Sequence, residues 1–275
     1  MWLKIEHRTS YRYCQLVGYT IQQCRLTPPS NSQQKVHAWQ ITSNAEMSQQ
    51  FDYHGNLSHM IVIDTPHDWI EIVTKGEVRT GSFLRTQVAE SVPLAVYLRK
   101  TALTEIDVDI VHFTQPFKPL SNATDRDVLA NIYALMHAVS VAMPYTKYVT
   151  NVYTSAIQAF GLKKGVCQDH SHVFISCCRA LNYPARYVSG YLFTADFSLV
   201  ETHAWAEVWC GEVLGWQGFD VSNGVQPDER YVKLAIGLDY REACPLSGIR
   251  QGGGLETMIV QVSVNQANQS QQSQQ

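Results

Sequence analysis

Residues 1–95 alternate between apolar and polar side chains and are interrupted by turn signals at short intervals. The segment LKIEHRTSYRY, which starts at Leu3, places every second residue on one side, as a half-buried β-strand does. A turn-rich break follows at RLTPPSNSQQ, and strand-like segments follow at KVHAWQITS and DWIEIVTKGEVRT. His54-Gly55-Asn56 marks a hairpin turn between two further strands. This pattern predicts an antiparallel β-sandwich or a small barrel.

Composition excludes several classes of partner. The chain has 275 residues, of which 45% are hydrophobic, and this is enough for a substantial core. Its net charge is −3 and it has no basic stripe, so we expect no nucleic-acid partner and no anionic membrane partner. The opening MWLKIEHRTSYRY lacks the apolar stretch of a secretory signal, and no apolar run is long enough to span a membrane.

The seven cysteines point to a reducing compartment. They are odd in number, scattered along the chain, and never form a Cys-x-x-Cys pair. This pattern is unlike the disulfide framework of a small secreted domain, and it offers no zinc site. We therefore predict a cytoplasmic protein without a zinc site.

The second part of the chain mixes helices and strands. Residues 96–120 hold PFKPL and are interpreted as a connector. Helical spacing of apolar residues follows from Ser121, where Asn122 or Thr124 is the expected cap, and a short second helix is expected in the 154–160 region. A third helix starts at Cys167 and is stopped by Pro184. The strand-like segments ARYVSGYLF, HAWAEVW and GWQGFD follow, and the Gln-rich tail 265–275 is predicted to be disordered.

The strands HAWAEVW and GWQGFD bring a histidine to an aspartate if they form a hairpin. A turn centred on Gly211-Glu212 places Glu207 opposite Trp216 and His203 opposite Asp220. Opposed Cβ atoms in such a pair lie about 4.5–5.5 Å apart, which suits a hydrogen bond between an imidazole and a carboxylate. A bulge in the glycine-containing GEVLG loop would change this pairing.

Cys167 is the partner that such a pair would activate. A thiolate is the reactive form of cysteine, and both a helix N-terminus and a neighbouring imidazolium favour it. His203 would supply that imidazolium and later protonate a leaving amine, while Asp220 would orient the ring. The backbone N–H of Cys167 would stabilise an oxyanion. Each residue also has an ordinary structural interpretation, as a buried thiol, a strand histidine and a turn aspartate.

The segment GVCQDHSHVFISCCRALNYPARYVSGYL, together with THAWAEVW and GWQGFDVSNG, resembles the bacterial transglutaminase-like cysteine protease family. The resemblance extends to LKIEHRTSYRY and DYHGN, which are similar to the family's N-terminal β domain. It implies an α+β, papain-like core with helices packed on an antiparallel sheet, preceded by an all-β domain. It also implies a catalytic triad of Cys167, His203 and Asp220, with no cofactor.

The chain departs from the family pattern in a few places. The family usually has Asp-Pro-Thr-Asn where this chain has Asp220-Val221-Ser222-Asn223. Animal transglutaminases carry an upstream tryptophan that helps to stabilise the oxyanion, whereas this chain has no tryptophan between Trp69 and Trp205. Tyr145 is the candidate for a related place, and the missing tryptophan favours hydrolysis over cross-linking.

Other polar residues near the cysteine have two interpretations each. Gln168 and Asp169 lie in the first helical turn, where an acid is expected structurally, and either would line a cleft. Trp205 is expected as core or as a hydrophobic substrate wall. His170 and His172 lack a second Cys/His pair for zinc and are expected to line the cleft or face solvent.

These observations predict a cysteine-dependent amide hydrolase that acts on a peptide or protein through a thioester. Transfer of the acyl group to a primary amine is the alternative, and a non-catalytic binding scaffold is a third hypothesis. The predicted organisation is a β domain over 1–95, a connector over 96–120, a catalytic core over 121–264 and a tail over 265–275. The sequence leaves the substrate and the oligomeric state open.

Overall fold

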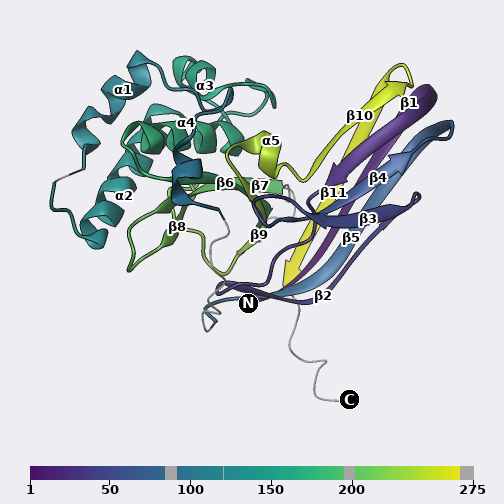
Figure 1. Cartoon of the computed structure of the whole chain (residues 1–275), viewed down its shortest axis with the longest axis horizontal. Helices are drawn as coiled ribbons and strands as arrows, with labels where there is room; N and C mark the ends of the chain where they lie inside the picture. Colours follow the sequence, from purple (N-terminus) through teal and green to yellow (C-terminus); the bar gives the residue numbers. More distant parts are fainter. Residues whose placement is uncertain (84–91, 120, 195–201, 267–275) are drawn as a thin grey trace.

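The computed structural model describes residues 1–83, 92–119, 121–194 and 202–266. Figure 1 shows two parts, with helices and a short-stranded sheet on one side and a sheet of long strands on the other. The helical part holds the sequence from the connector to α5 (Tyr240–Ala243), and the strand-rich part holds both ends of the described chain. The fold is therefore the predicted mixture of an all-β region and a helix-on-sheet core.

The large sheet is organised around one strand of 23 residues, β1 (Trp2–Cys24). Ile5 pairs with β5 on one edge and with β11 on the other, while Thr20 pairs with β4 and with β10. All pairings are antiparallel. In the described residues the sheet comprises β1, β2 (Gln34–Ser43), β3 (Met47–Phe51), β4 (Leu57–Ile63), β5 (His67–Thr80), β10 (Leu246–Gly252) and β11 (Glu256–Gln266). The predicted strands and the His54-Gly55-Asn56 turn are present, but they form one sheet around a long strand.

The C-terminal strands return to the N-terminal sheet. Leu246 to Gly252 and Glu256 to Gln266 pair with β1. The catalytic core was predicted to cover 121–264, but the chain after about residue 245 belongs to the large sheet. Asn265 and Gln266, expected in the tail, form the end of β11. Local pattern does not distinguish these two strands from core strands, because only long-range pairing decides which sheet they join. The remainder of the predicted tail lies outside the described residues.

The core packs helices on a second antiparallel sheet with the order β8-β7-β6-β9. Its strands are β6 (Ala185–Leu192), β7 (Thr202–Trp209), β8 (Trp216–Phe219) and β9 (Tyr231–Gly237). Its helices are η1 (Leu94–Leu98), α1 (Val108–Thr114), η2 (Gln115–Phe117), α2 (Asp125–Ala142), α3 (Ala156–Leu162), α4 (Cys167–Ala180) and α5. Helix α4 is buried along nearly its whole length, because its apolar residues face both the other helices and the sheet.

The ends of these helices follow the sequence signals. Thr124 caps α2 in a capping box with Asp127, as one of the two predicted caps. Helix α3 begins one residue after its cap Ser155. After α4, Asn182 takes a left-handed conformation with φ 63°, where the chain turns before Pro184. The central helix α4 itself begins at Cys167, as predicted.

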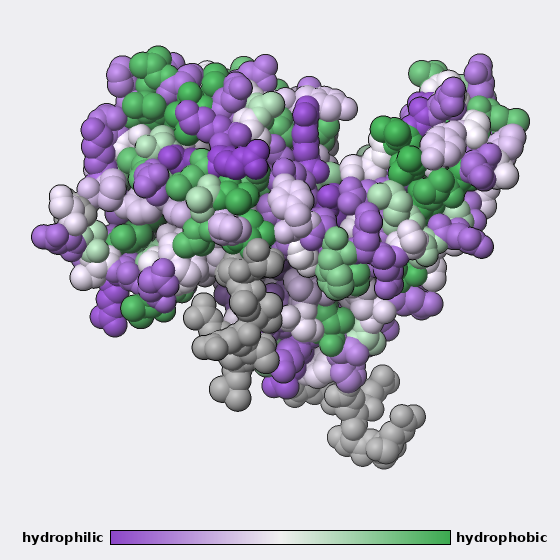
Figure 2. Space-filling model, in the orientation of Figure 1, coloured by the Kyte–Doolittle hydropathy of each residue, from purple (hydrophilic) through white to green (hydrophobic). Residues whose placement is uncertain are grey.

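The core sheet joins the two parts of the molecule. Ala204, Ala206 and Val208 of β7 belong to the helical cluster, whereas Tyr191 and Val232 pack with apolar residues of the large sheet. Figure 2 shows a notch between the helical part and the far end of the large sheet. The contact between the two parts is therefore concentrated around β9 and the end of the large sheet that lies opposite the notch.

Candidate active site

Cys167 is the first residue of α4 and its side chain is half-buried. The first backbone hydrogen bond of the helix runs from His170 N–H to Val166 O at 3.0 Å. The N–H groups of residues 167–169 therefore precede the helical ladder, as at any helix N-terminus. They make this end of α4 a suitable place for an anionic sulfur or an oxyanion.

Asp169 fixes the chain that leads into the helix. Its Oδ2 accepts hydrogen bonds from Val166 N–H at 2.8 Å and from the Thr150 hydroxyl at 2.6 Å, and the residue is 1% exposed. A Cβ on Gly165 would lie 2.6 Å from the Asp169 Cβ, so only glycine fits there. The Gly-Val-Cys-Gln-Asp motif thus has a local physical cause, and Asp169 holds the helix start instead of lining an open cleft.

His203 and Asp220 are joined by a hydrogen bond of 2.7 Å between Nε2 and Oδ2. Their strands are shifted relative to the prediction: Trp209 faces Trp216 and Ala206 faces Phe219, so His203 and Asp220 are diagonal neighbours. The predicted turn at Gly211-Glu212 is wrong, because the loop holds residues 211–214 and is closed by a bond from Cys210 N–H to Gly215 O.

The cause of this shift is a tertiary contact. The Asp125 carboxylate at the start of α2 accepts hydrogen bonds from Val213 N–H at 2.8 Å and Leu214 N–H at 3.2 Å. Gly211 has φ 105°, and a Cβ there would meet the Asp125 carboxylate. The loop is therefore shaped by a helix far away in the sequence, which local turn preferences do not contain.

The surroundings of His203 favour the imidazolium. Burial by itself lowers the pKa of the ring, but hydrogen bonds to Asp220 and to Cys167 and the nearby negative charges raise it to about 10. Since Nε2 bonds Asp220, Nδ1 is the ring nitrogen left for the Cys167 sulfur. The ring thus lies between the Cys167 thiol at the helix start and a buried carboxylate.

Asp220 is completely buried and has two partners that the sequence did not reveal. The Tyr231 hydroxyl donates to Oδ2 at 2.7 Å, and the Asn223 side-chain amide donates to the same oxygen at 2.7 Å. Burial would raise the pKa of Asp220, but the bonds to His203, Tyr231 and Asn223 lower it. Asn223 lies in the Asp-Val-Ser-Asn segment, so its position in the motif was the available signal, whereas Tyr231 comes from a separate strand.

Trp205 is buried and packs against the His203 ring. It is 2% exposed, and its ring centroid lies 6.4 Å from that of His203 and 5.5 Å from that of Tyr231. A Cβ on Gly190 would lie 2.6 Å from the Trp205 ring, so glycine at this position of β6 makes room for the indole. Trp205 therefore belongs to the core, as one of the two interpretations of the sequence has it.

Tyr145 and Gln168, two of the other predicted residues, contact the loop segments near Cys167. Tyr145 forms a parallel bridge with Gly165 and is 46% exposed, and its ring lies 6.0 Å from His170. The Gln168 side chain donates to Val152 O at 3.3 Å. Tyr145 is therefore paired two residues before Cys167 and Gln168 directly follows it, and the use of either by a substrate stays a prediction.

His170 and His172 are buried, so the expectation that they line a cleft or face solvent is wrong. His170 bonds Ser222 Oγ at 2.8 Å and Met143 O at 2.7 Å, while His172 Nε2 accepts from Tyr240 N–H at 3.1 Å. Burial lowers the pKa of both rings, that of His172 to about 3. Within the described ranges, no three side chains gather that would hold a metal ion.

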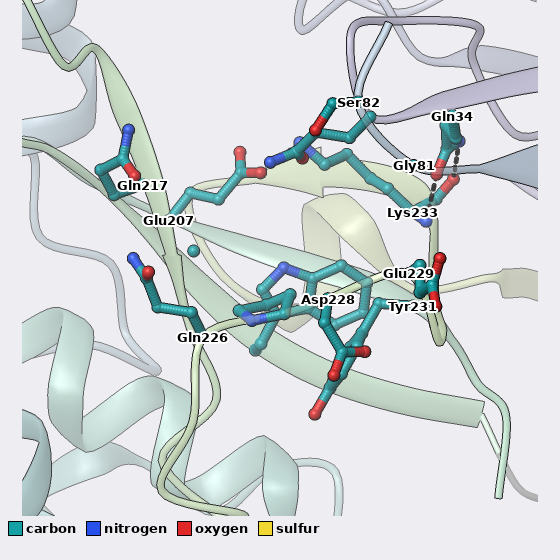
Figure 3. Close-up of a pocket in the computed structure, with 14 residues that line it drawn as sticks. Gln34, Gly81, Ser82, Glu207, Gln217, Gln226, Asp228, Glu229, Tyr231 and Lys233 are labelled. Atoms are coloured by element: carbon teal, nitrogen blue, oxygen red, sulfur yellow. Dashed lines mark hydrogen bonds and ion pairs between the residues drawn. The ribbon is translucent and has the colours of Figure 1, made fainter. Parts of the chain in front are cut away.

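An open pocket of about 390 Å³ lies between the core sheet and the large sheet (Figure 3). Trp205 and Tyr231, which contact the triad, form part of its wall. Glu207 lies on the same wall and binds Arg186 at 2.8 Å and Lys233. Gln34 and Ser82 of the N-terminal region also line the pocket, so both parts of the molecule contribute to its wall.

A thiol at a helix N-terminus, beside an imidazole that a buried carboxylate orients, is the arrangement of cysteine hydrolases and acyltransferases. Two family models match the chain in agreement with this class. Residues 3–79 match the bacterial transglutaminase-like N-terminal region, and residues 118–221 match the transglutaminase-like superfamily. The N-terminal region and the core are thus each matched by their own family model, which confirms the resemblance of the motifs to the bacterial transglutaminase-like family.

Relatives share this organisation over their full length. An uncharacterized protein of Mycobacterium leprae is 28% identical over 283 residues, which are 96% of this chain and 99% of that protein. An uncharacterized protein of Mycobacterium tuberculosis is 28% identical over 290 residues, with 95% and 91% covered. A proposed cysteine protease of Cytophaga hutchinsonii has the same fold, with a TM-score of 0.76 at 20% identity over 98% of this chain and 92% of that one.

Proposed function

We propose that the protein is a cysteine-dependent amide hydrolase that acts on peptide or protein substrates through Cys167, His203 and Asp220. The observation that carries the proposal is the position of His203, whose ring bonds the Asp220 carboxylate at 2.7 Å and interacts with the Cys167 thiol at the start of α4. A raised pKa of His203 favours the thiolate–imidazolium pair, because the proton then resides on the ring at neutral pH.

The reaction has two steps. The Cys167 sulfur attacks the amide carbonyl, and the backbone N–H of Cys167 stabilises the oxyanion. The His203 Nδ1–H then protonates the leaving amine, the C–N bond breaks, and a thioester remains. Neutral His203 takes a proton from water, the hydroxide attacks the thioester, and the carboxylic acid leaves as the thiolate–imidazolium pair is restored. Asp220 holds the ring through both steps.

Transamidation differs only in the second step, where a primary amine attacks the thioester in place of water. The absence of a tryptophan between Trp69 and Trp205 favours hydrolysis in this proposal. All seven cysteines are free thiols, which supports a reducing compartment such as the cytoplasm. No helix among the described residues combines the length and the apolar character that a membrane span requires.

The test is alkylation of Cys167 by iodoacetamide as a function of pH, measured by peptide mass spectrometry. Cys14 is the internal reference, because it is exposed while the five cysteines other than Cys14 and Cys167 are buried. We expect Cys167 to be alkylated much faster than Cys14 at neutral pH, and to lose this difference in His203→Ala. If Cys167 and Cys14 have the same pH profile, and His203→Ala changes neither, the proposed mechanism is wrong.

A further inference from the structure

Strand β9 is an outer strand of the core sheet, and a side chain of the N-terminal region completes its free edge. The Gln34 amide donates from Nε2 to Lys233 O at 2.8 Å and accepts from Lys233 N–H at Oε1, also at 2.8 Å (Figure 3). These are the two bonds that a neighbouring strand would make. Gln34 is 2% exposed and also donates to Pro29 O at 2.7 Å, so its orientation is fixed.

A second side chain holds the backbone just before β9. Thr80 is the register partner of Gln34 across β5 and β2, and it is 3% exposed. Its hydroxyl donates to the backbone oxygen of Glu229. Glu229 and Lys233 each lie two residues from Tyr231, one on either side. We call this pair, Gln34 and Thr80, the clamp.

The residue between the two clamped positions contacts the triad. Tyr231 is 6% exposed, and its hydroxyl donates to Asp220 Oδ2 at 2.7 Å, the same oxygen that His203 Nε2 bonds. Asp220 thus depends on β9 for a hydrogen bond that its own strand cannot supply. Tyr231 itself pairs with Leu192 of β6, while the clamp holds the backbone two residues before and two residues after it.

We propose that the Gln34–Thr80 clamp positions the catalytic triad, by fixing Tyr231 so that its hydroxyl holds Asp220 against His203. The N-terminal β domain is then a working part of the active site, and Gln34, Thr80 and Tyr231 are positioning residues. The inference rests on the proposed function for what the triad does. It concerns the placement of Asp220, which is measurable without a substrate.

The chain offers matched controls for both clamp residues. Asn56 makes the same paired amide bonds to Ile236 of β9, at 2.7 and 2.9 Å, but five residues from Tyr231. Thr74 is a completely buried threonine of the same sheet whose hydroxyl has no hydrogen-bond partner among the described residues. Asn56→Leu and Thr74→Val therefore report what loss of a buried amide or hydroxyl does without touching the clamp.

The experiment is an NMR titration of the His203 ring in the full chain, with the melting temperature of each variant recorded. In Gln34→Leu and Thr80→Val we expect the pKa of His203 to fall by about half a unit or more, since Asp220 no longer stays against the ring. Asn56→Leu and Thr74→Val should leave it unchanged, and Thr80→Ser should restore the wild-type value. In a Tyr231→Phe background, Thr80→Val should have no further effect.

Equal shifts in the clamp and control variants would overturn the inference, and so would a clamp effect that persists without the Tyr231 hydroxyl. The ring titration needs no substrate, and Cys167 is unchanged in every clamp and control variant, so these variants are compared with the same thiol beside the ring. If wild-type Cys167 reacts like Cys14, the proposed function is wrong, while the titration still decides whether the clamp positions Asp220.

Discussion

His203 and Asp220 are hydrogen-bonded at 2.7 Å although they are not opposite each other in the sheet. The register of β7 and β8, continued by one residue, places Asp220 opposite Trp205, and His203 lies one diagonal step away. This offset has a structural consequence. The indole of Trp205 occupies the directly opposed place beneath the ring, while the carboxylate reaches across to the imidazole.

Replacement of the carboxylate tests the role of Asp220 directly. Asp220→Asn replaces the carboxylate to which the His203 N–H, the Tyr231 hydroxyl and the Asn223 amide all donate by a neutral amide, so the ring loses the negative charge beside it. We expect the pKa of His203 to fall below its value of about 10, and amide hydrolysis to fall by about 10²–10⁴-fold. NMR of the ring and steady-state kinetics measure the two effects. An unchanged pKa of His203 would refute the assigned role.

The start of α4 is tested with a pair of glycines. Gly165→Ala would force a Cβ to within 2.6 Å of Asp169, so the segment before Cys167 must move. We expect a loss of about 2 kcal/mol or more in the free energy of unfolding, and slower alkylation of Cys167. Gly161→Ala in α3 has open space and should stabilise the protein by up to about 1 kcal/mol. Urea unfolding compares them, and equal effects would contradict the packing argument.

Glu207 is predicted to be a stability residue. Burial would raise its pKa, but Lys233 and Arg186 lower it to about 2. Glu207→Gln leaves two cations beside a neutral amide, and we expect a loss of about 3–5 kcal/mol in urea unfolding. Because the folded pKa is depressed, this stability exists above pH 4.5 and is lost as the pH falls toward 2. The half-exposed Arg8–Glu71 pair is the control, since Glu71→Gln should cost less than about 1 kcal/mol.

His203 has the opposite linkage. Its folded pKa is raised from 6.5 to about 10, so its contribution to stability is complete below pH 6.5 and is lost as the pH rises through 10. Wild-type protein should therefore lose more stability between pH 6.5 and 10 than His203→Gln does, when both are unfolded in urea. Parallel curves for the two proteins would show that His203 does not gain its proton affinity on folding.

The fate of the thioester separates hydrolysis from transamidation. With a peptide amide substrate in labelled water and an excess of a labelled primary amine, we expect the acid product to carry the oxygen of water. Mass spectrometry of the product distinguishes the acid from the amide. A product that carries mainly the amine would establish transamidation as the second step.

Much of the site was predictable because its determinants are local. The Gly-Val-Cys-Gln-Asp segment encodes the helix start, and Asp169 and Gly165 explain why this start is reproducible. The alternation of β1 and the cap at Thr124 are likewise local properties of the chain. The motifs also identified His203 and Asp220 as partners, although the register assigned to their strands was shifted by two residues.

The sequence by itself determined the fold class, the helix that begins at Cys167 and the residue types of the triad, because periodicity, caps and motifs act over short distances. Tertiary structure alone decided the rest. Asp125 set the hairpin loop, β10 and β11 joined the N-terminal sheet, and the hydroxyl of Tyr231 came to Asp220 on a separate strand. Each of these contacts joins segments with no local signal for one another, so only the packing of the whole chain selects them.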